Sequence, residues 1–265
     1  MSVRYARRLL ALSAALLLFA SLAHAQATQT KPFEPTVGQA GKDVVWVPTP
    51  QSLVERMLDL AKLTPQDFLM DLGSGDGRTV ITAAKRGATA QGIEYNPDMV
   101  ALSQRNAKDA GVTGKATFVK ADLFETDFSK ATVVTMFLLP DINLRLRPKI
   151  LDMKPGTRIV SNTFTMGEWK ADETADLGAG GKGSCNESWC TALLWIVPAK
   201  VAGTHKLPQG ELTLKQEFQM LSGTFRTEGK TLAIANGRVR GEEVSFKAGG
   251  KDYRGRVSNG KLELK

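Results

Sequence analysis

One short stretch of the chain combines an acid with a turn that carries almost no side-chain bulk. Residues 68–70 form an apolar run suited to a strand buried in a parallel sheet, and Asp71 ends it. The turn that follows consists of Gly73, Ser74, Gly75, Asp76 and Gly77. Glycines let a backbone approach a ligand closely, and the first N–H groups of the helix predicted from Arg78 can bind a carboxylate or phosphate. Strand, glycine turn and helix in this order predict the ligand-binding unit of a Rossmann-like sheet.

Two further acids, Glu94 and Asp122, follow the ends of the next two predicted strands. An acid at the end of the second strand of such a sheet accepts hydrogen bonds from ribose hydroxyls. An acid after the third strand can accept from an adenine amino group while the next backbone N–H contacts the ring; the alternative for Asp122 is an ordinary turn residue. Neighbouring groups complete the predicted adenosine site: Tyr95, Asn96 and Leu123.

The glycine pattern resembles motif I of the class I S-adenosylmethionine (SAM) methyltransferases, in which an acid precedes G-x-G-x-G. Residues 71–77 carry this resemblance, and their sequence is also similar to the corresponding motif of lysine methyltransferases outside the SET class. A dinucleotide-binding loop, G-x-G-x-x-G, would need a glycine where this chain has Arg78. This difference weakens the alternative interpretation as an NAD dehydrogenase. An ordinary tight turn in another α/β protein is the remaining alternative.

Two longer stretches, residues 48–77 and 135–148, resemble a narrower group. These are the bacterial relatives of the mitochondrial lysine methyltransferases that modify the ATP synthase c-subunit and the adenine nucleotide translocase. The resemblance covers roughly residues 43–197 and implies SAM as cofactor and N-methylation of a protein lysine. An export signal and a β-rich tail depart from the group, which leaves the acceptor open. A small molecule, a lipid, or an exported SAM-fold binding module without catalysis are the alternatives.

The methyl acceptor is expected at the carboxyl end of the predicted strand 132–139, because α/β sheets bind ligands at that edge. The substrate-side candidates are Thr49, Phe137, Pro140 and Asp141. Phe137 can also be a core residue, and Thr49 is a candidate through the resemblance alone. The catalytic base stays unknown, with Asp141 and Glu168 as candidates only by location.

Alternating strand and helix patterns predict an α/β fold, a Rossmann-like class I methyltransferase sheet over residues 43–200 finished by an antiparallel hairpin. Its first helix is expected to start with Ser52 as N-cap in a capping box with Glu55. Residues 198–208 are expected to be a connector. The period-two pattern and frequent glycines of residues 210–265 then predict a small antiparallel β-meander domain.

The first 25 residues have the parts of a secretory signal: arginines at 4, 7 and 8, an apolar run over 9–22, and Ala-His-Ala at 23–25. The apolar run is shorter than the ~20 residues that span a bilayer, which disfavours a membrane anchor. We therefore predict cleavage before Gln26, a linker over residues 26–42, and a protein that is periplasmic or secreted and has no membrane span after cleavage.

Charge and cysteine content narrow the function classes. The formal net charge of +8 falls to +5 without the three signal arginines, which is mild for a nucleic-acid binder, so no nucleic-acid partner is expected. Cys185 and Cys190 are the only cysteines, and an oxidising compartment predicts a disulfide between them. With His205 as the only histidine after the signal, neither a metal site nor a histidine-dependent hydrolase is expected.

Overall fold

The computed structural model describes residues 33–178, 185 and 189–265. The predicted signal and the first part of the predicted linker lie outside these residues. By internal packing the chain divides into residues 1–34 and a compact unit over residues 35–265. Among the described residues, no helix combines the length and apolar character needed to cross a membrane, and no cluster of His, Cys, Asp and Glu could hold a metal ion.

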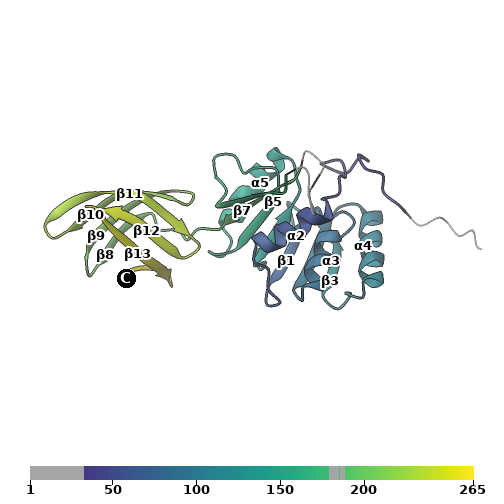
Figure 1. Ribbon diagram of the computed structural model, residues 1–265, viewed down its shortest axis with the longest axis horizontal. Coiled ribbons are helices and arrows are strands. Elements are labelled where there is room, and N and C mark those ends of the chain that lie inside the picture. The colour runs from purple at the N-terminus through teal and green to yellow at the C-terminus, as the bar shows by residue number, and fades with distance from the viewer. Residues whose placement is uncertain (1–32, 179–184, 186–188) are drawn as a thin grey trace, which may run out of the picture. The chain divides into compact units, whose positions relative to one another are not determined.

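A mixed seven-stranded sheet forms the first half of this unit, as Figure 1 shows. The strand order is β3-β2-β1-β4-β5-β7-β6, with β1 to β5 parallel to one another and β7 antiparallel to both of its neighbours, β5 and β6. Its strands are β1 (Phe68–Leu72), β2 (Thr89–Glu94), β3 (Ala116–Lys120), β4 (Val133–Met136), β5 (Arg158–Asn162), β6 (Glu173–Asp176) and β7 (Thr191–Ile196). Its helices are α2 (Gln51–Leu60), α3 (Arg78–Lys85), α4 (Pro97–Asp109) and α5 (Pro140–Leu151). The predicted class I methyltransferase sheet with its terminal antiparallel hairpin is confirmed.

Both faces of this sheet are covered, because successive residues of its buried strands point to opposite sides. On β1, Leu69 packs with residues of α2 and α3 in one core cluster. Its neighbour Met70 packs with residues of α5 in a second cluster. Since β2 and β3 lie on one side of β1 and β4 on the other, the strand order reverses between β1 and β4. Ligands of open α/β sheets bind at the carboxyl ends of the strands at such a point.

The first helix begins differently from the prediction. Its N-cap is Pro50, with no side-chain cap hydrogen bond, so Ser52 lies inside the first turn and the predicted capping box is wrong. Glu55 instead accepts a hydrogen bond from the Gln51 side chain, with 3.2 Å between Nε2 and Oε1.

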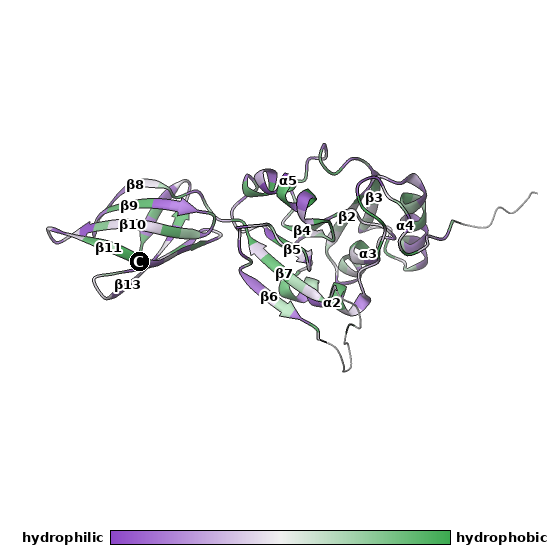
Figure 2. Ribbon diagram, turned by 90° about the horizontal axis from the view of Figure 1, so that it is seen from above, coloured by the Kyte–Doolittle hydropathy of each residue, from purple (hydrophilic) through white to green (hydrophobic). Residues whose placement is uncertain are grey.

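The second half of the unit is an antiparallel seven-stranded meander, ordered β14-β13-β12-β11-β10-β9-β8. Its strands are β8 (Gly203–Leu207), β9 (Gly210–Glu217), β10 (Met220–Thr227), β11 (Lys230–Arg240), β12 (Glu243–Ala248), β13 (Lys251–Ser258) and β14 (Lys261–Leu264). Leu212, Phe225 and Phe246 belong to its own core cluster. Hydrophilic and hydrophobic residues share strands such as β9 and β10, as period-two patterning requires (Figure 2). The expected connector contains β8, so this sheet begins before Gly210.

Candidate cofactor site at the carboxyl edge of the parallel sheet

The three predicted acids Asp71, Glu94 and Asp122 line one cavity at the carboxyl edge of the sheet. The other predicted cofactor-side residues on its wall are Gly73, Ser74, Gly75, Tyr95, Asn96 and Leu123. Gly77 is not among the lining residues. It is the N-cap of α3, and a Cβ there would lie 2.7 Å from the Phe118 ring and 2.9 Å from the Ser103 Cβ. Its missing side chain lets α3 pack against its neighbours.

The glycine turn has a backbone that other residues rarely adopt. Gly73, Gly75 and Gly77 have φ values of +78°, +54° and +83°, in the left-handed region. The N–H groups of Gly73 and Ser74 both donate to the carbonyl of Ile93, at 2.9 and 3.0 Å, which ties the turn to the end of β2. Neighbouring side chains leave little space above the turn. A Cβ on Gly73 would lie 3.1 Å from Leu138 Cδ2, and a Cβ on Gly75 would lie 2.7 Å from Trp46 Nε1.

Ser74 provides a direct indication of a polar ligand. Its residue is 5% exposed, and its Oγ has no hydrogen-bond partner in the protein. A buried hydroxyl without a partner is costly, so such atoms are rare in native structures. The side chain lines the cavity, and Gly92 of β2 leaves room for it, since a Cβ there would lie 2.5 Å from the Ser74 Oγ. A bound molecule with hydrogen-bonding groups would satisfy this atom.

Glu94 is oriented by backbone groups on both sides. One carboxylate oxygen accepts from the N–H of Gly75 at 3.0 Å, and the other from the N–H of Asn96 at 2.9 Å. The Asn96 side chain is itself the N-cap of α4, accepting from the N–H of Asp98 at 2.9 Å. Each carboxylate oxygen keeps a further lone pair, so Glu94 can still accept from a ligand hydroxyl.

Asp71 is buried at the end of β1, with 7% of the residue exposed. Its Oδ1 accepts from the Thr135 hydroxyl at 2.7 Å. Burial raises the pKa of Asp71 to about 7; the Thr135 hydrogen bond opposes this rise, and the nearby carboxylates of Glu94 and Asp76 add to it. A cationic ligand in the cavity would favour the ionised form of Asp71.

An N-terminal segment that the sequence did not assign to the site also lines the cavity. The Gly38 N–H donates to the Trp46 carbonyl at 2.8 Å, and the Trp46 N–H donates to the Gln39 carbonyl at 2.9 Å. Lys42 forms an ion pair with Asp122, and its Nζ lies 4.6 Å from the centroid of the Tyr95 ring. Gly38, Gln39 and Lys42 of the predicted linker are therefore bonded to residues of the cavity wall. Their sequence carries no motif that could have indicated this.

The predicted substrate-side residues divide into two groups. Thr49 and Phe137 line the cavity, whereas Pro140 and Asp141 begin α5 and do not. Glu168 is also outside it: it pairs with Arg147 at 2.9 Å, and this hydrogen bond lowers the pKa of the carboxyl. A second recess adjoins the cavity and shares part of its wall. Its lining consists of residues 40–45 and 47, Phe137, Leu138, Leu139, Phe164 and Trp189.

The predicted disulfide between Cys185 and Cys190 is present, with 5.7 Å between the two Cα atoms. Both cysteines are buried, with 4% and 7% exposed. Trp189 lies directly before Cys190, so the bridge fixes the main chain next to one wall residue of the second recess.

A Rossmann-like sheet with a glycine turn and acids around one cavity defines a class I SAM-dependent methyltransferase, and comparison with known proteins agrees. Residues 71–173 match the family model of the ANTKMT methyltransferase domain. A protein-lysine N-methyltransferase of Saccharolobus islandicus (strain REY15A) is 47% identical over 133 residues, which are 49% of this chain and 83% of that protein. The chain belongs to the ANTKMT methyltransferase family, and it is an enzyme that uses SAM.

Other relatives differ in length and in the acceptor that their names give. The human lysine N-methyltransferase of the ATP synthase c-subunit is 34% identical over 134 residues, which are 50% of this chain and 57% of that protein. A crystal structure of an RNA methyltransferase from Salinibacter ruber, in complex with S-adenosyl-L-homocysteine, is 46% identical and has a TM-score of 0.54. That match covers 58% of this chain and 96% of the other. The meander lies outside the part matched by the family model.

Proposed function

We propose that this enzyme methylates the side-chain amine of a lysine in a protein, and that it does so in the periplasm or outside the cell. The use of SAM as methyl donor is supported by one observation: polar groups line a single cavity, and the unpartnered Ser74 Oγ is among them. The 47% identical archaeal protein is named a protein-lysine N-methyltransferase, which supports the acceptor half.

In this proposal each residue of the cofactor site has one task. Glu94 accepts from the ribose hydroxyls with the lone pairs that its backbone donors leave unused. Asp122 and the Leu123 N–H contact the adenine, and Tyr95 lines the adenosine. Ser74 and the glycine turn contact the amino-acid part of SAM, with Asp71 providing negative charge beneath it. SAM, when bound, supplies a methyl group already activated on a cationic sulfur, so the protein mainly aligns the acceptor.

The acceptor reaches the transferred methyl through the second recess. A lysine amine has an ordinary pKa of about 10.4 and must lose its proton before it can attack. The largely apolar walls of the recess and a nearby positive charge both disfavour the protonated form. Asp43 is the one carboxylate among the described residues that line this recess, so it can attract the incoming ammonium group. Sequence reasoning did not assign Asp43 to the site.

Export has separate support. The arginines, apolar run and small residues of the first 25 residues have the order of a cleavable signal, and the disulfide suits an oxidising compartment. Amino-terminal sequencing of the protein from its native host should start at Gln26. A protein that keeps its first residues, or that is found in the cytoplasmic fraction, would contradict export without affecting the proposed reaction.

The acceptor is tested with isotope-labelled SAM and cell-envelope fractions, with the Glu94→Ala variant as the matched control. We expect label in protein that is removed by protease, and mass spectrometry should place it on lysine. Glu94→Ala should bind SAM more weakly by about 1–3 kcal/mol, the scale of a lost hydrogen bond to a charged group. Label in lipid or in a small molecule would contradict the acceptor. SAM binding without transfer to any fraction would indicate a non-catalytic binding module.

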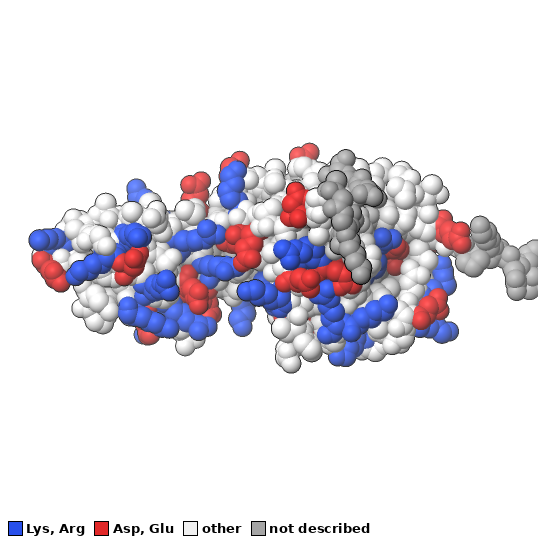
Figure 3. Space-filling model, in the orientation of Figure 1, with Lys and Arg blue, Asp and Glu red and all other residues white. Residues whose placement is uncertain are grey.

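RNA is the second candidate acceptor, because the 46% identical Salinibacter protein is described as an RNA methyltransferase. The charge of this chain argues against it: on the face drawn in Figure 3, Lys and Arg are interspersed with Asp and Glu rather than gathered in one patch. Label that ribonuclease removes and protease does not would establish the RNA acceptor.

A further inference from the structure

Three aromatic side chains from three separate segments meet at the second recess. Phe137 follows β4, Phe164 follows β5, and Trp189 precedes β7. The Phe137 and Phe164 rings are stacked with 5.8 Å between centroids, and the Trp189 indole is tilted against Phe137 at 6.1 Å. Phe137 also lines the cofactor cavity. The aromatic surface therefore continues from the cofactor cavity into the recess.

Phe164 is held by contacts on its own turn and from α5. Thr163 before it has φ +59°, a strained conformation for a β-branched residue, and residues strained in this way cluster at functional sites. The Phe164 carbonyl accepts from the Ser161 hydroxyl at 2.8 Å and from the Asn143 side-chain amide at 3.2 Å. These contacts fix the main chain at Phe164, whose side chain is half-buried.

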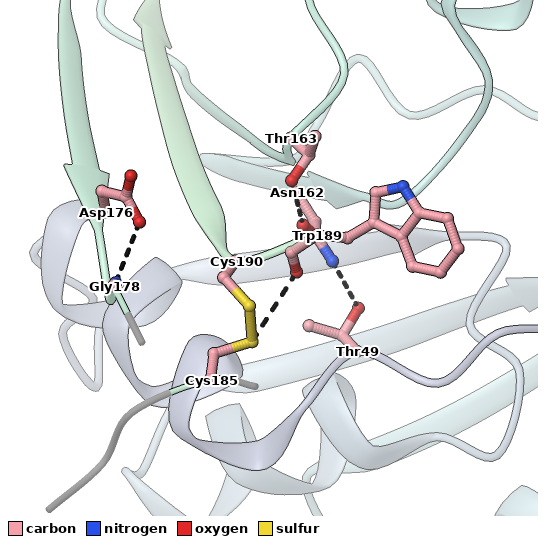
Figure 4. The surroundings of a disulfide bond; sticks show 8 residues. All are labelled: Thr49, Asn162, Thr163, Asp176, Gly178, Cys185, Trp189 and Cys190. Atoms are coloured by element: carbon pink, nitrogen blue, oxygen red, sulfur yellow. Dashed lines mark hydrogen bonds between the residues drawn. A yellow bond between two sulfur atoms is a disulfide. The ribbon is translucent and has the colours of Figure 1, made fainter. Parts of the chain in front are cut away.

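Trp189 is fixed in another way. It is 37% exposed, whereas both cysteines of the neighbouring disulfide are buried. Figure 4 shows the indole extending away from the bridge, while the Cys190 side chain turns back to Cys185. An exposed indole at a recess normally has many rotamers and main-chain positions to choose from. The disulfide restricts the main chain at this point, and the Cys185 Sγ lies 3.9 Å from the Trp189 carbonyl oxygen.

We propose that Phe137, Phe164 and Trp189 form an aromatic wall that receives the cationic amine of the acceptor side chain, and that the Cys185–Cys190 disulfide positions Trp189 in this wall. The inference rests on the proposed transfer to an amine. Asp43 is the carboxylate among the described residues of this recess. Direct contact with it would favour the protonated amine, which cannot attack, so the aromatic faces rather than Asp43 must hold the amine at the point of transfer. Ring faces attract an ammonium group by cation–π interaction without forming an ion pair, so the amine can still lose its proton.

The test uses the full mature protein and four variants. Trp189→Ala removes the indole, Trp189→Phe keeps an aromatic face, and a Cys185→Ser/Cys190→Ser double variant removes the bridge. Met220→Ala changes another exposed apolar residue, 51% exposed on β10, and is the matched control. Each variant is assayed for SAM binding by calorimetry and for methyl transfer to the peptide acetyl-Ala-Lys-Ala-amide. Tetramethylammonium and the neutral tert-butanol of similar shape serve as direct probes of the wall, followed by saturation-transfer NMR.

For Trp189→Ala we expect a rise of about tenfold in the KM for the peptide, with unchanged SAM affinity. Trp189→Phe should restore most of the loss, and the double variant should lie between Trp189→Ala and the wild type. Tetramethylammonium should bind and tert-butanol should not, and the difference should disappear in Trp189→Ala. Met220→Ala should behave as the wild type.

The outcomes separate this inference from the proposed function. Normal peptide methylation and tetramethylammonium binding in Trp189→Ala would overturn the aromatic wall and leave the lysine acceptor intact. No methylation of the peptide by any form, with tetramethylammonium still bound in a Trp189-dependent way, would contradict the peptide acceptor and keep the cation site. A double variant equal to the wild type would remove the disulfide from the proposal.

Discussion

The two ends of β1 each carry a buried acid, and the two acids are in opposite electrostatic situations. Asp67 precedes the strand and Asp71 lies within its carboxyl half, and each is 7% exposed. Both residues are therefore almost inaccessible to solvent, but the carboxyl group of Asp71 lies deeper in the protein than that of Asp67. The partners that the fold supplies at each end also differ.

Asp67 has enough partners to offset its burial. Burial alone would raise its pKa, but hydrogen bonds from Arg158, from the Thr132 hydroxyl at 2.7 Å and from the Thr64 N–H at 2.8 Å bring the pKa below its ordinary value. Its ionised form is stabilised by the protein itself. Such an acid holds the fold together and leaves nothing for a ligand to do.

Asp71 has hydrogen bonds from the Thr135 and Thr79 hydroxyls but no cationic partner among the described residues, and burial together with the nearby Glu94 and Asp76 carboxylates outweighs them, so its pKa rises to about 7. The protein leaves its charge uncompensated at the edge where the strand order reverses. Perturbed acids cluster at functional sites, and this pair shows why: the missing partner at Asp71 is what a cationic ligand provides. The predictions that follow test this contrast.

Replacing Gly73 by Val should have the largest effect. The φ of +78° is strained for a β-branched residue, and a Cβ there already lies 3.1 Å from Leu138. We expect SAM affinity to fall by more than about 100-fold, a loss above roughly 2.7 kcal/mol by the affinity relation. Isothermal titration calorimetry of the folded variant measures it.

Gly111→Val is the matched control, because Gly111 has a φ of +69° with nothing within 4 Å of the added Cβ. It carries the same type of backbone strain without facing the cavity, so it should lose stability and keep SAM affinity. An equal loss of affinity in both variants would mean that strain, and not the site, explains the result.

Asp67→Ala should cost stability and nothing else. The variant removes the carboxylate partner of Arg158, which keeps its hydrogen bonds to the carbonyls of Ala61 and Lys62. The lost hydrogen bonds to a charged group should cost about 1.5–3 kcal/mol in the free energy of unfolding. Urea denaturation measures this loss, and the SAM affinity of the folded variant should be unchanged. Adding Arg158→Met should restore part of the stability, since the uncompensated charge is then gone. A drop in SAM affinity would show that the two ends of β1 are not independent.

Much of the cofactor side could be predicted because its chemistry is local in sequence. The glycine turn and the acids Asp71 and Glu94 each lie at a fixed offset from a strand. The apolar runs, with the glycines and acids that end them, were therefore enough to predict these residues. Gly77 shows the limit: its pattern is that of a ligand loop, but the structure uses it to pack α3 against Phe118. A glycine pattern does not tell whether the free space faces a ligand or a side chain.

The rest of the site depends on contacts between distant segments. Lys42 reaches Asp122 eighty positions along the chain, and Phe164 and Trp189 meet Phe137 from two other segments. No periodicity or motif in the sequence indicates contacts between such distant segments. Pro140 and Asp141 were predicted beside the acceptor because they follow β4, but their side chains do not line the cavity, whereas the next residue of α5, Ile142, does. Local offset predicts the strand end and not which side chains after it face the cavity.

Asp71→Asn should change how stability depends on pH. The pKa is about 7 in the folded protein against an ordinary 3.8, so the folded state holds more protons between about pH 4 and pH 7. Stability should therefore fall as pH rises through that window and stay level above pH 7. The asparagine removes this slope, an effect of roughly 2–4 kcal/mol between pH 4 and pH 8. Urea titrations at both pH values measure it, and the same slope in both proteins would contradict the raised pKa.

The same variant should separate SAM from S-adenosyl-L-homocysteine. Ionised Asp71 attracts the positive sulfonium, so wild-type affinity for SAM should rise as pH passes about 7, while affinity for the neutral product should change less. The comparison of the two ligands cancels the titration of the amino and carboxyl groups that they share. In Asp71→Asn the difference between the ligands should no longer depend on pH.

Lys42→Ala should have the smallest effect. It extends the contrast between Asp67 and Asp71 to a third acid, because Asp122 lines the cofactor cavity and yet has a cationic partner in the protein. Hydrogen bonding from Lys42 lowers the pKa of Asp122, as Arg158 does for Asp67, but both side chains of this pair reach solvent. If Asp122 accepts from the adenine amino group, Lys42 competes for the same oxygens. Removing Lys42 should then tighten SAM binding at low salt by less than about threefold, a change that disappears at high ionic strength. Asp122→Asn should weaken SAM binding at any salt concentration. If Lys42→Ala weakened SAM binding instead of tightening it, Lys42 would be a direct contributor to the cofactor site.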